Sequence, residues 1–169
     1  VVVSATVPRG SARALAARSA VAYIEPAPEL TERNNDIRWI VQTNVPSSTP
    51  FYTAGLHGEG QILGIMDTRV DMFHCSFSDP AHPIGLLHRK ILAYNRDFTI
   101  GGSHGTHVGA TAVGDAGADA ETRGVAYLAK LVYAGIPAYN EVSVLAALTL
   151  HQLQGARVHT NSWGNDATT

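Results

Sequence analysis

The sequence predicts an α/β fold built around a mostly parallel sheet. From residue 58 onward, short apolar or β-branched runs alternate with longer helix-forming stretches, which is typical of a parallel sheet covered on both faces. The composition agrees, because 45% of the 169 residues are hydrophobic and only 15% are charged, so the chain can bury a core. We find no internal repeat.

Charge and hydropathy exclude several classes of function. The 12 basic and 14 acidic residues give a net charge of −2, and no run of like charge favours a nucleic-acid partner. No apolar run reaches the roughly 18 residues of a membrane-spanning helix, and the first residues lack the basic flank of a signal peptide. The single cysteine, Cys75, forms no internal disulfide. We therefore expect no nucleic-acid partner and no membrane segment.

The first fifty residues differ in character from the rest. Residues 1–7 and 20–24 are β-branched or apolar and predict strands, and residues 11–19 between them predict a short helix. Residues 28–50 are polar and proline-containing, which favours a linker, with "RWIV" (38–41) as a short strand or an anchored arm. The predicted organisation is thus a small α+β segment over 1–27, a linker over 28–50 and a main domain over 51–169.

The main domain opens with "GEGQILGIMDT", an apolar run that predicts a strand buried on both faces and ending at Asp67. Five further elements follow: a strand in "KILAY", a helix starting at the histidines of "SHGTHV", a strand in "AKLVYAGI", a helix through "EVSVLAALTLHQLQGA" and the strand "RVHTNSWG". Ligands of open α/β sheets gather at the carboxyl ends of such strands. Asp67 therefore lies where a functional carboxylate is expected.

Asp67 and His104 are the candidate catalytic residues. A strand-end aspartate can cap the next turn, or it can orient a histidine. A histidine that opens a helix can be an ordinary polar residue, or, as a neutral ring, it can accept a proton as a general base. We expect Gly105 to allow a close backbone approach and Thr106 to offer a capping hydroxyl.

His107 and the segment "NSWG" have alternatives of their own. We expect His107 to be a buried ring bonded to the backbone. A zinc site formed by His104, His107 and either Asp67 or Asp71 is the weaker alternative, because helical zinc histidines more often stand four apart around a glutamate. "TNSWG" is either a strand edge that accepts an extended peptide or a buried tryptophan followed by a turn.

Taken in order, these segments resemble the subtilisin-like serine peptidases. The aspartate motif of that family, an apolar strand ending in D-[ST]-G, is similar to the sequence around Asp67. The histidine motif H-G-T-H-V-A-G is matched over His104–Val108. The matching residues of the first motif are Ile65, Met66, Asp67 and Thr68, continued by Val70, Asp71, His74 and Phe77. Downstream, "RGVAYLAKLVYAGI" and "NSWG" resemble the strand after the histidine helix and the substrate-binding strand.

The resemblance implies a three-layer α/β sandwich that hydrolyses peptide bonds with an Asp-His-Ser triad. Asp67 would orient His104, and His104 would take the proton of a serine nucleophile. Ser162, Trp163 and Gly164 would pair with the substrate backbone. Catalysis would need no cofactor or metal. The family often binds structural calcium, and Asp115 and Asp119 lie in a loop that could contribute ligands, but their spacing does not assign a site.

The same resemblance gives expectations about partners and location. Residues 1–27 would be the end of an inhibitory propeptide, which would make the propeptide a partner besides the peptide or protein substrate. Location would be secreted or extracytoplasmic. We also weigh a non-catalytic remnant that keeps only a peptide-binding edge around "NSWG".

Departures from the family pattern lie close to the motifs. Arg69 stands where the family has glycine, and it could compete with His104 for Asp67 or clash with the backbone conformation. Gly109 and Ala110 exchange the usual order of alanine and glycine, and Cys75 replaces a frequent proline. We expect this chain to be the incomplete first half of the catalytic domain, because the segment with the nucleophilic serine is not found in it, and we expect the chain alone to be inactive.

Overall fold

The computed structural model describes residues 7–8, 10–24, 34–95, 103–117, 120–136 and 141–163. The chain divides into two compact units, Val1–Glu32 and Arg33–Thr169. The first unit contains helix α1 (Ser11–Ala16), as predicted. The strand expected over 20–24 is wrong for these residues, which have no regular structure and leave the side chain of Tyr23 70% exposed. A strand needs a paired neighbour, and none is bonded to this segment within the described residues.

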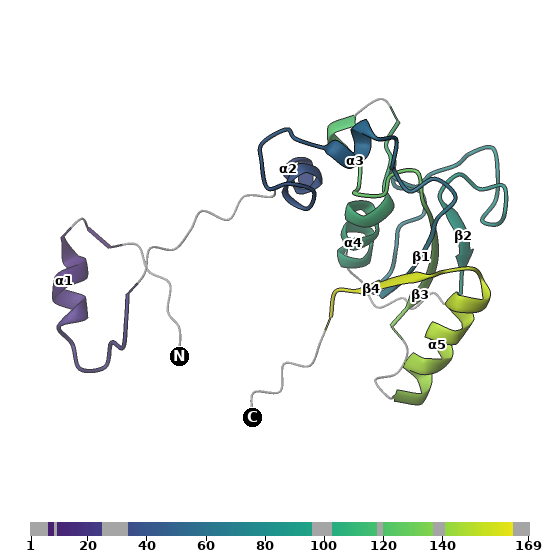
Figure 1. Ribbon diagram of the computed structural model, residues 1–169. Coiled ribbons are helices and arrows are strands. Elements are labelled where there is room, and N and C mark those ends of the chain that lie inside the picture. The colour runs from purple at the N-terminus through teal and green to yellow at the C-terminus, as the bar shows by residue number, and fades with distance from the viewer. Residues whose placement is uncertain are drawn as a thin grey trace. The chain divides into compact units, whose positions relative to one another are not determined.

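The second unit holds the sheet and most of the helices (Figure 1). Its strands are β1 (Ile62–Asp67), β2 (Ile91–Tyr94), β3 (Lys130–Gly135) and β4 (Val158–Asn161). Its helices are α2 (Asn34–Ile40), α3 (Pro50–Thr53), α4 (His104–Val113), the short 3-10 helix η1 (Ala120–Thr122) and α5 (Glu141–Leu153). The predicted order of strands and helices in the main domain is confirmed.

The four strands form one parallel sheet in the order β2-β3-β1-β4. β1 lies between β3 and β4, with Asp67 paired to Gly135 and Met66 paired to Asn161. The carboxyl ends of the strands therefore meet at one edge of the sheet. Their apolar sequences explain this position, because β1 and β3 are buried along most of their length.

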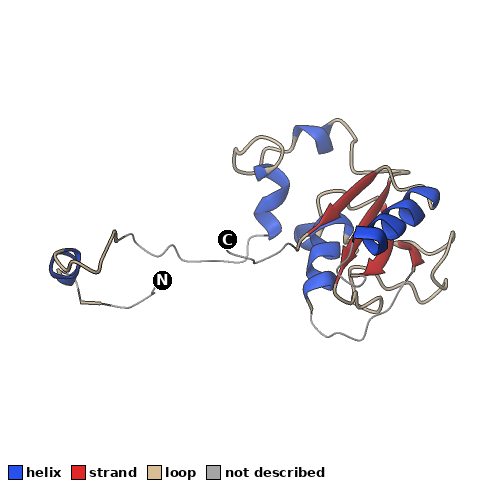
Figure 2. Cartoon of the chain, turned by 90° about the horizontal axis from the view of Figure 1, so that it is seen from below, coloured by secondary structure: helices blue, strands red, loops and turns tan. Residues whose placement is uncertain are grey.

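Helices cover both faces of the sheet (Figure 2). The face toward α4 carries Ile65, Leu131 and Tyr133, which belong to the main hydrophobic core. The face toward α5 carries Gly64, where an added Cβ would meet the side chains of His151 and His159. Since side chains alternate along a strand, Asp67 falls on the same face as Ile65 and so points toward α4.

One local expectation in the segment before the sheet needs comment. Of the two alternatives for "RWIV", a short strand or an anchored arm, the strand is wrong, since α2 continues to Ile40 and is supported by a hydrogen bond from Trp39 Nε1 to Asp36 Oδ1 at 3.3 Å. A contact one turn apart is available only in a helix, which explains the difference. The side chain of Arg38 anchors this helix by donating to the carbonyl of Ala120 at 2.8 Å.

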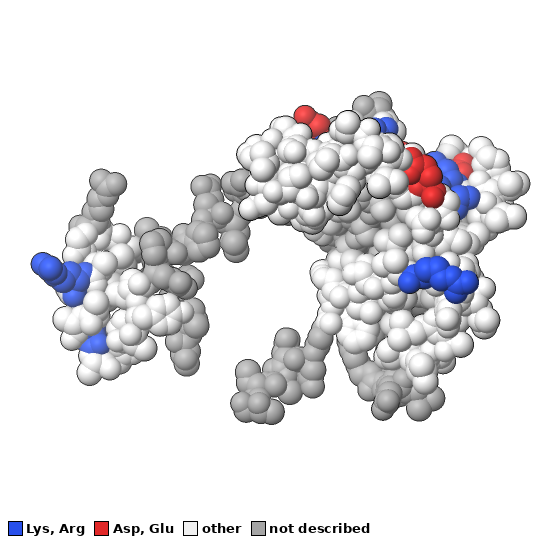
Figure 3. Space-filling model, viewed as in Figure 1, with Lys and Arg blue, Asp and Glu red and all other residues white. Residues whose placement is uncertain are grey.

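The surface of the second unit agrees with the weak net charge. The face seen in Figure 3 is mostly uncharged and carries scattered acidic and basic side chains. Among the described residues, no helix is long and apolar enough to span a bilayer.

Candidate active site

Strand β1 delivers Asp67 to the carboxyl edge of the sheet. Asp67 is fully buried, and its main-chain carbonyl accepts a hydrogen bond from Ile136 at 2.8 Å, which extends the pairing with β3 by one residue. The side-chain Oδ1 accepts from the main-chain N–H of Thr68 at 2.7 Å. Oδ2 is buried and has no hydrogen-bond partner in the described structure. The carboxylate is thus fixed in one orientation by its own turn.

His104 is the first residue of α4, and its ring meets this carboxylate. Nδ1 of His104 lies 2.6 Å from Oδ1 of Asp67, and because an ionised carboxylate can only accept, Nδ1 carries the hydrogen. The aspartate side chain is 1% exposed and the histidine side chain 53% exposed. In the neutral ring the other nitrogen, Nε2, therefore carries no hydrogen and is free to accept one. This arrangement can take a proton from a neighbouring hydroxyl.

Thr68 connects the two residues. Its hydroxyl accepts a hydrogen bond from the main-chain N–H of Gly105 at 2.9 Å and lies 3.3 Å from Oδ1 of Asp67. The expected capping hydroxyl was Thr106, and that expectation is wrong, because Thr106 Oγ1 instead accepts from the N–H of Asp71 at 2.8 Å. The cap of α4 comes from a residue that is distant in sequence and adjacent only in the fold.

Gly105 permits this close approach, as predicted. A Cβ at this position would overlap the carbonyl oxygen of Thr68 and the hydroxyl of Tyr133, and it would also lie 2.8 Å from the carbonyl oxygen of Arg69. The first turn of α4 therefore packs directly on the backbone that follows Asp67. Any side chain would push His104 away from its partner.

The expectation that His107 is buried is wrong. Its side chain is exposed, while Thr106, Gly109 and Val113 are the buried positions of α4. Those residues lie three and four apart on one face, and His107 is turned away from that face by about 100° relative to Thr106. Within the described residues, no group of three or more His, Cys, Asp or Glu side chains could hold a metal ion.

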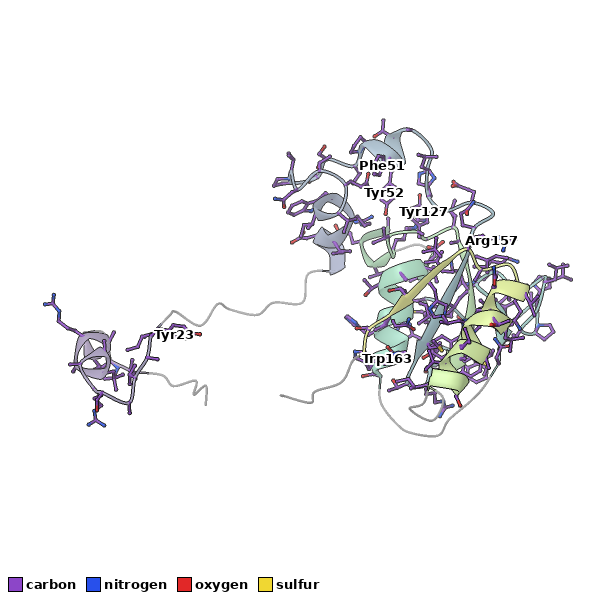
Figure 4. All side chains as sticks on the ribbon, turned by 60° about the horizontal axis from the view of Figure 1, so that its bottom comes forward. Tyr23, Phe51, Tyr52, Tyr127, Arg157 and Trp163 are labelled. Carbon is purple, nitrogen blue, oxygen red and sulfur yellow. The ribbon has the colours of Figure 1, made fainter. Side chains whose placement is uncertain are left out.

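The predicted substrate-binding segment follows β4. Trp163, labelled in Figure 4, is partly buried. Its Nε1 donates to the carbonyl of Met66, the residue before Asp67, at 2.8 Å. Ser162 is exposed beside it. Gly164 lies outside the described residues. Of the three predicted binding residues, Trp163 is therefore bonded to the strand that carries Asp67.

Arg69 does not disturb the pair. Its side chain is exposed, and it forms no ion pair with Asp67, although both residues are described. Among the described residues, positive φ angles outside glycine occur only at Asn44 and Ser47, so position 69 does not need the conformational range of glycine. Of the other departures, Ala110 packs against the hydrophobic core, and Cys75 is exposed.

The loop considered for calcium does not fit a cation at Asp115. Oδ1 of Asp115 already accepts from Arg123 Nε at 3.1 Å and from the N–H of Gly117 at 3.0 Å. The guanidinium supplies the positive charge that a metal would bring. Asp119 lies outside the described residues. Structural calcium stays a prediction without a site in the described part of the chain.

Two residues near the pair were missed in the sequence. Tyr94 ends β2, and Tyr133 lies in β3, and both hydroxyls bond to the backbone that follows Asp67. Both tyrosines sit in strands that the sequence predicts, near carboxyl ends. A tyrosine at the carboxyl end of a buried strand was the available signal, since a buried hydroxyl must find a partner.

Comparison with known proteins gives the same assignment as the geometry. A model of the Subtilase family matches residues 58–169. Two relatives from Dictyostelium discoideum are named "Serine protease/ABC transporter B family protein": tagA is 34% identical over 173 residues, covering 90% of this chain and 10% of the relative, and tagD is 39% identical over 132 residues, covering 65% of this chain and 7% of the relative. The chain spans a tenth or less of the length of these relatives. It belongs to the subtilase family of serine peptidases.

Proposed function

We propose that the complete protein to which this chain belongs is a serine endopeptidase that uses Asp67 and His104. The observation that carries the proposal is the 2.6 Å hydrogen bond between His104 Nδ1 and Asp67 Oδ1, with the aspartate buried and the imidazole half exposed. Asp67 holds the ring in the tautomer whose Nε2 is free to accept a proton. His104 takes the hydroxyl proton of the nucleophile and later donates it to the leaving amine.

The serine nucleophile belongs to a segment outside these 169 residues. Ser103 precedes His104 at the start of α4, and Ser162 follows β4, but within the described residues neither hydroxyl bonds to His104. The 169-residue chain alone therefore provides the acid-base half of a triad and does not hydrolyse peptides. Residues 1–27 act as the end of a propeptide, and the substrate is a peptide or protein that lies along Ser162 and Trp163.

A fluorophosphonate probe tests both the peptidase function of the complete protein and the inactivity of the 169-residue chain, because it labels only a serine activated by a neighbouring base. We expect stoichiometric labelling of the complete protein at one serine outside this chain, and loss of labelling in the His104→Ala variant. The 169-residue chain should stay unlabelled. Labelling of any serine within 1–169 contradicts the proposed inactivity, and an unlabelled complete protein contradicts the peptidase function.

Peptide binding without hydrolysis is the second candidate. β4 lies at the edge of the described sheet and pairs with β1 alone, and its residues are mostly exposed. An extended peptide can add to such an edge through main-chain hydrogen bonds. A complete protein that is not labelled by the probe but binds peptides in a fluorescence polarisation assay favours this candidate.

A further inference from the structure

Two tyrosines from neighbouring strands lie under the turn that follows Asp67. Tyr94 is the last residue of β2, and Tyr133 lies opposite it in the register of β3. Their ring centroids are 5.3 Å apart, with the planes inclined by 34°. Tyr133 is fully buried in the main core. The two rings therefore form a fixed base on the α4 side of the sheet.

The hydroxyls hold the turn on both sides of Arg69. Tyr133 donates a hydrogen bond to the carbonyl of Thr68. The hydroxyl of Tyr94 accepts from the N–H of Val70 at 3.2 Å and lies 3.3 Å from the carbonyl of the same residue. Residues 68 and 70 are thus attached to the sheet, while the side chain between them points to solvent. We call these contacts the tyrosine clamp, formed by Tyr94 and Tyr133.

Thr68 transmits the position of the clamp to the catalytic pair. The residue that Tyr133 holds by its carbonyl donates its own N–H to Asp67 at 2.7 Å, and its hydroxyl caps α4 through Gly105 at 2.9 Å. One residue therefore orients the carboxylate and the first turn of the helix that carries His104. A shift of Thr68 by a few tenths of an ångström would move both the carboxylate of Asp67 and the first turn of α4. It would therefore change the distance between His104 Nδ1 and Asp67 Oδ1.

The hydroxyl of Tyr133 also fills the space beside Gly105. A Cβ at that glycine would overlap both the hydroxyl of Tyr133 and the carbonyl of Thr68, so the three groups pack without room for a water molecule. Burial, and then the charge of Asp67, raise the pKa of Tyr133. The phenol keeps its proton at neutral pH and remains the donor to Thr68.

We infer that Tyr133, with Tyr94 as the second anchor, is a positioning residue that sets the Asp67–His104 hydrogen bond by holding the turn of residues 68–70. Both hydroxyls bond to the main chain of this turn and act on the catalytic pair through it. The effect of the clamp on catalysis rests on the proposed peptidase function. Its effect on the geometry of the Asp67–His104 hydrogen bond does not.

Tyr133→Phe tests the inference, because it removes one oxygen and keeps the ring in the core. Tyr52→Phe is the matched control: the hydroxyl of Tyr52 also donates to a backbone carbonyl, that of Val125 at 2.6 Å, and Tyr52 lies far from Trp163 in Figure 4. The first readout is the low-field proton resonance of His104 Nδ1–H in the 169-residue chain. The second is kcat and KM of the complete protein for a peptide substrate.

We expect the resonance to move upfield and broaden in Tyr133→Phe and to stay unchanged in Tyr52→Phe. In the complete protein, Tyr133→Phe should lower kcat about five- to tenfold with KM within about twofold, as for the loss of one buried hydrogen bond that acts on the transition state. Tyr94→Phe should have a smaller effect in the same direction. If Tyr133→Phe does not fold, Tyr94→Phe is the variant that tests the inference.

A Tyr133→Phe protein with the wild-type resonance and a kcat within twofold of wild type overturns the inference. So does an equal effect of Tyr52→Phe, which would show that any lost buried hydroxyl loosens the domain. If the complete protein proves not to be a peptidase, kinetics cannot be compared and the resonance alone decides. Failure of the function and failure of the clamp are therefore separate results.

Discussion

Asp67 and His104 meet across 37 positions of sequence, with the carboxylate 1% exposed and the imidazole 53% exposed. The pair is thus anchored at its buried end and open at the other. This asymmetry suits a base that must be held in one tautomer while it reaches a nucleophile. Substitutions at the pair can therefore change catalysis and the free energy of unfolding to different extents.

Asp67→Asn should remove activity without unfolding the protein. An amide can donate to Nδ1 and so favours the wrong histidine tautomer, for which triad enzymes lose on the order of 10⁴-fold in kcat. Asparagine keeps an oxygen that accepts from the N–H of Thr68 and replaces the charge-assisted hydrogen bond to His104 with a neutral one, which should cost on the order of 1 kcal/mol of unfolding free energy. Peptide hydrolysis by the complete protein and urea denaturation check the two statements. A variant that keeps more than a tenth of wild-type kcat contradicts the assigned role.

Gly105→Ala should destabilise the domain although alanine favours helices. The helix gain is at most about 1 kcal/mol, whereas the new methyl would overlap the oxygens of Thr68 and Tyr133, which typically costs about 1 to 3 kcal/mol. The matched control is Gly109→Ala in the same helix, where the methyl would lie 3.2 Å from the ring edge of Phe77 and 3.8 Å from Cδ2 of Leu131, with no backbone atom as close. Urea denaturation should show the larger loss for Gly105→Ala. Equal midpoints for the two variants would contradict the packing argument.

Arg69→Gly should leave the catalytic pair unchanged. Arg69 is exposed, makes no ion pair with Asp67 and does not adopt a positive φ, so glycine relieves nothing. Glycine gives the unfolded chain more freedom, which should lower the unfolding free energy by about 0.4 to 1 kcal/mol. The low-field resonance of His104 should stay in place. Its displacement would mean that the arginine does act on Asp67.

Stability should fall in mild acid because of a buried histidine pair. Nδ1 of His151 and Nε2 of His159 are 2.9 Å apart, and the outer ring nitrogens of both residues are buried without a partner in the described structure. Burial, and then the neighbouring His159, lower the pKa of His151 from 6.5 to about 4. Between pH 6.5 and about 4, the unfolded chain therefore binds a proton at His151 that the folded chain does not bind.

The direction of the pH dependence of stability follows from this difference in bound protons. The contribution of His151 is fully present above pH 6.5 and is lost as pH falls toward 4, by up to about 1.4 kcal/mol per pH unit. Urea midpoints between pH 7.5 and 4.5 measure the slope. The double variant His151→Leu with His159→Leu serves as the control and should show a shallower slope. An unchanged slope in that variant would assign the acid sensitivity to other groups.

The sequence itself determined the main elements and the candidate pair. The apolar run before Asp67 predicted the buried strand β1, and the segment "SHGTHV" predicted that His104 opens a helix, and both predictions agree with the structure because the signals are local. The linear order of these segments was enough to recognise the family. Strand formation over 20–24 was predicted from composition alone and failed, because pairing depends on a partner strand.

Tertiary structure decided what each side chain contacts. The exposure of His107 depends on which face of α4 packs on the sheet, and the capping role of Thr68 depends on a turn 37 residues away. The clamp of Tyr94 and Tyr133 requires β2 and β3 to lie side by side in a defined register. Local propensity fixes where a strand or helix begins and ends. Only the packing of these elements brings distant hydroxyls, carbonyls and carboxylates within hydrogen-bonding distance.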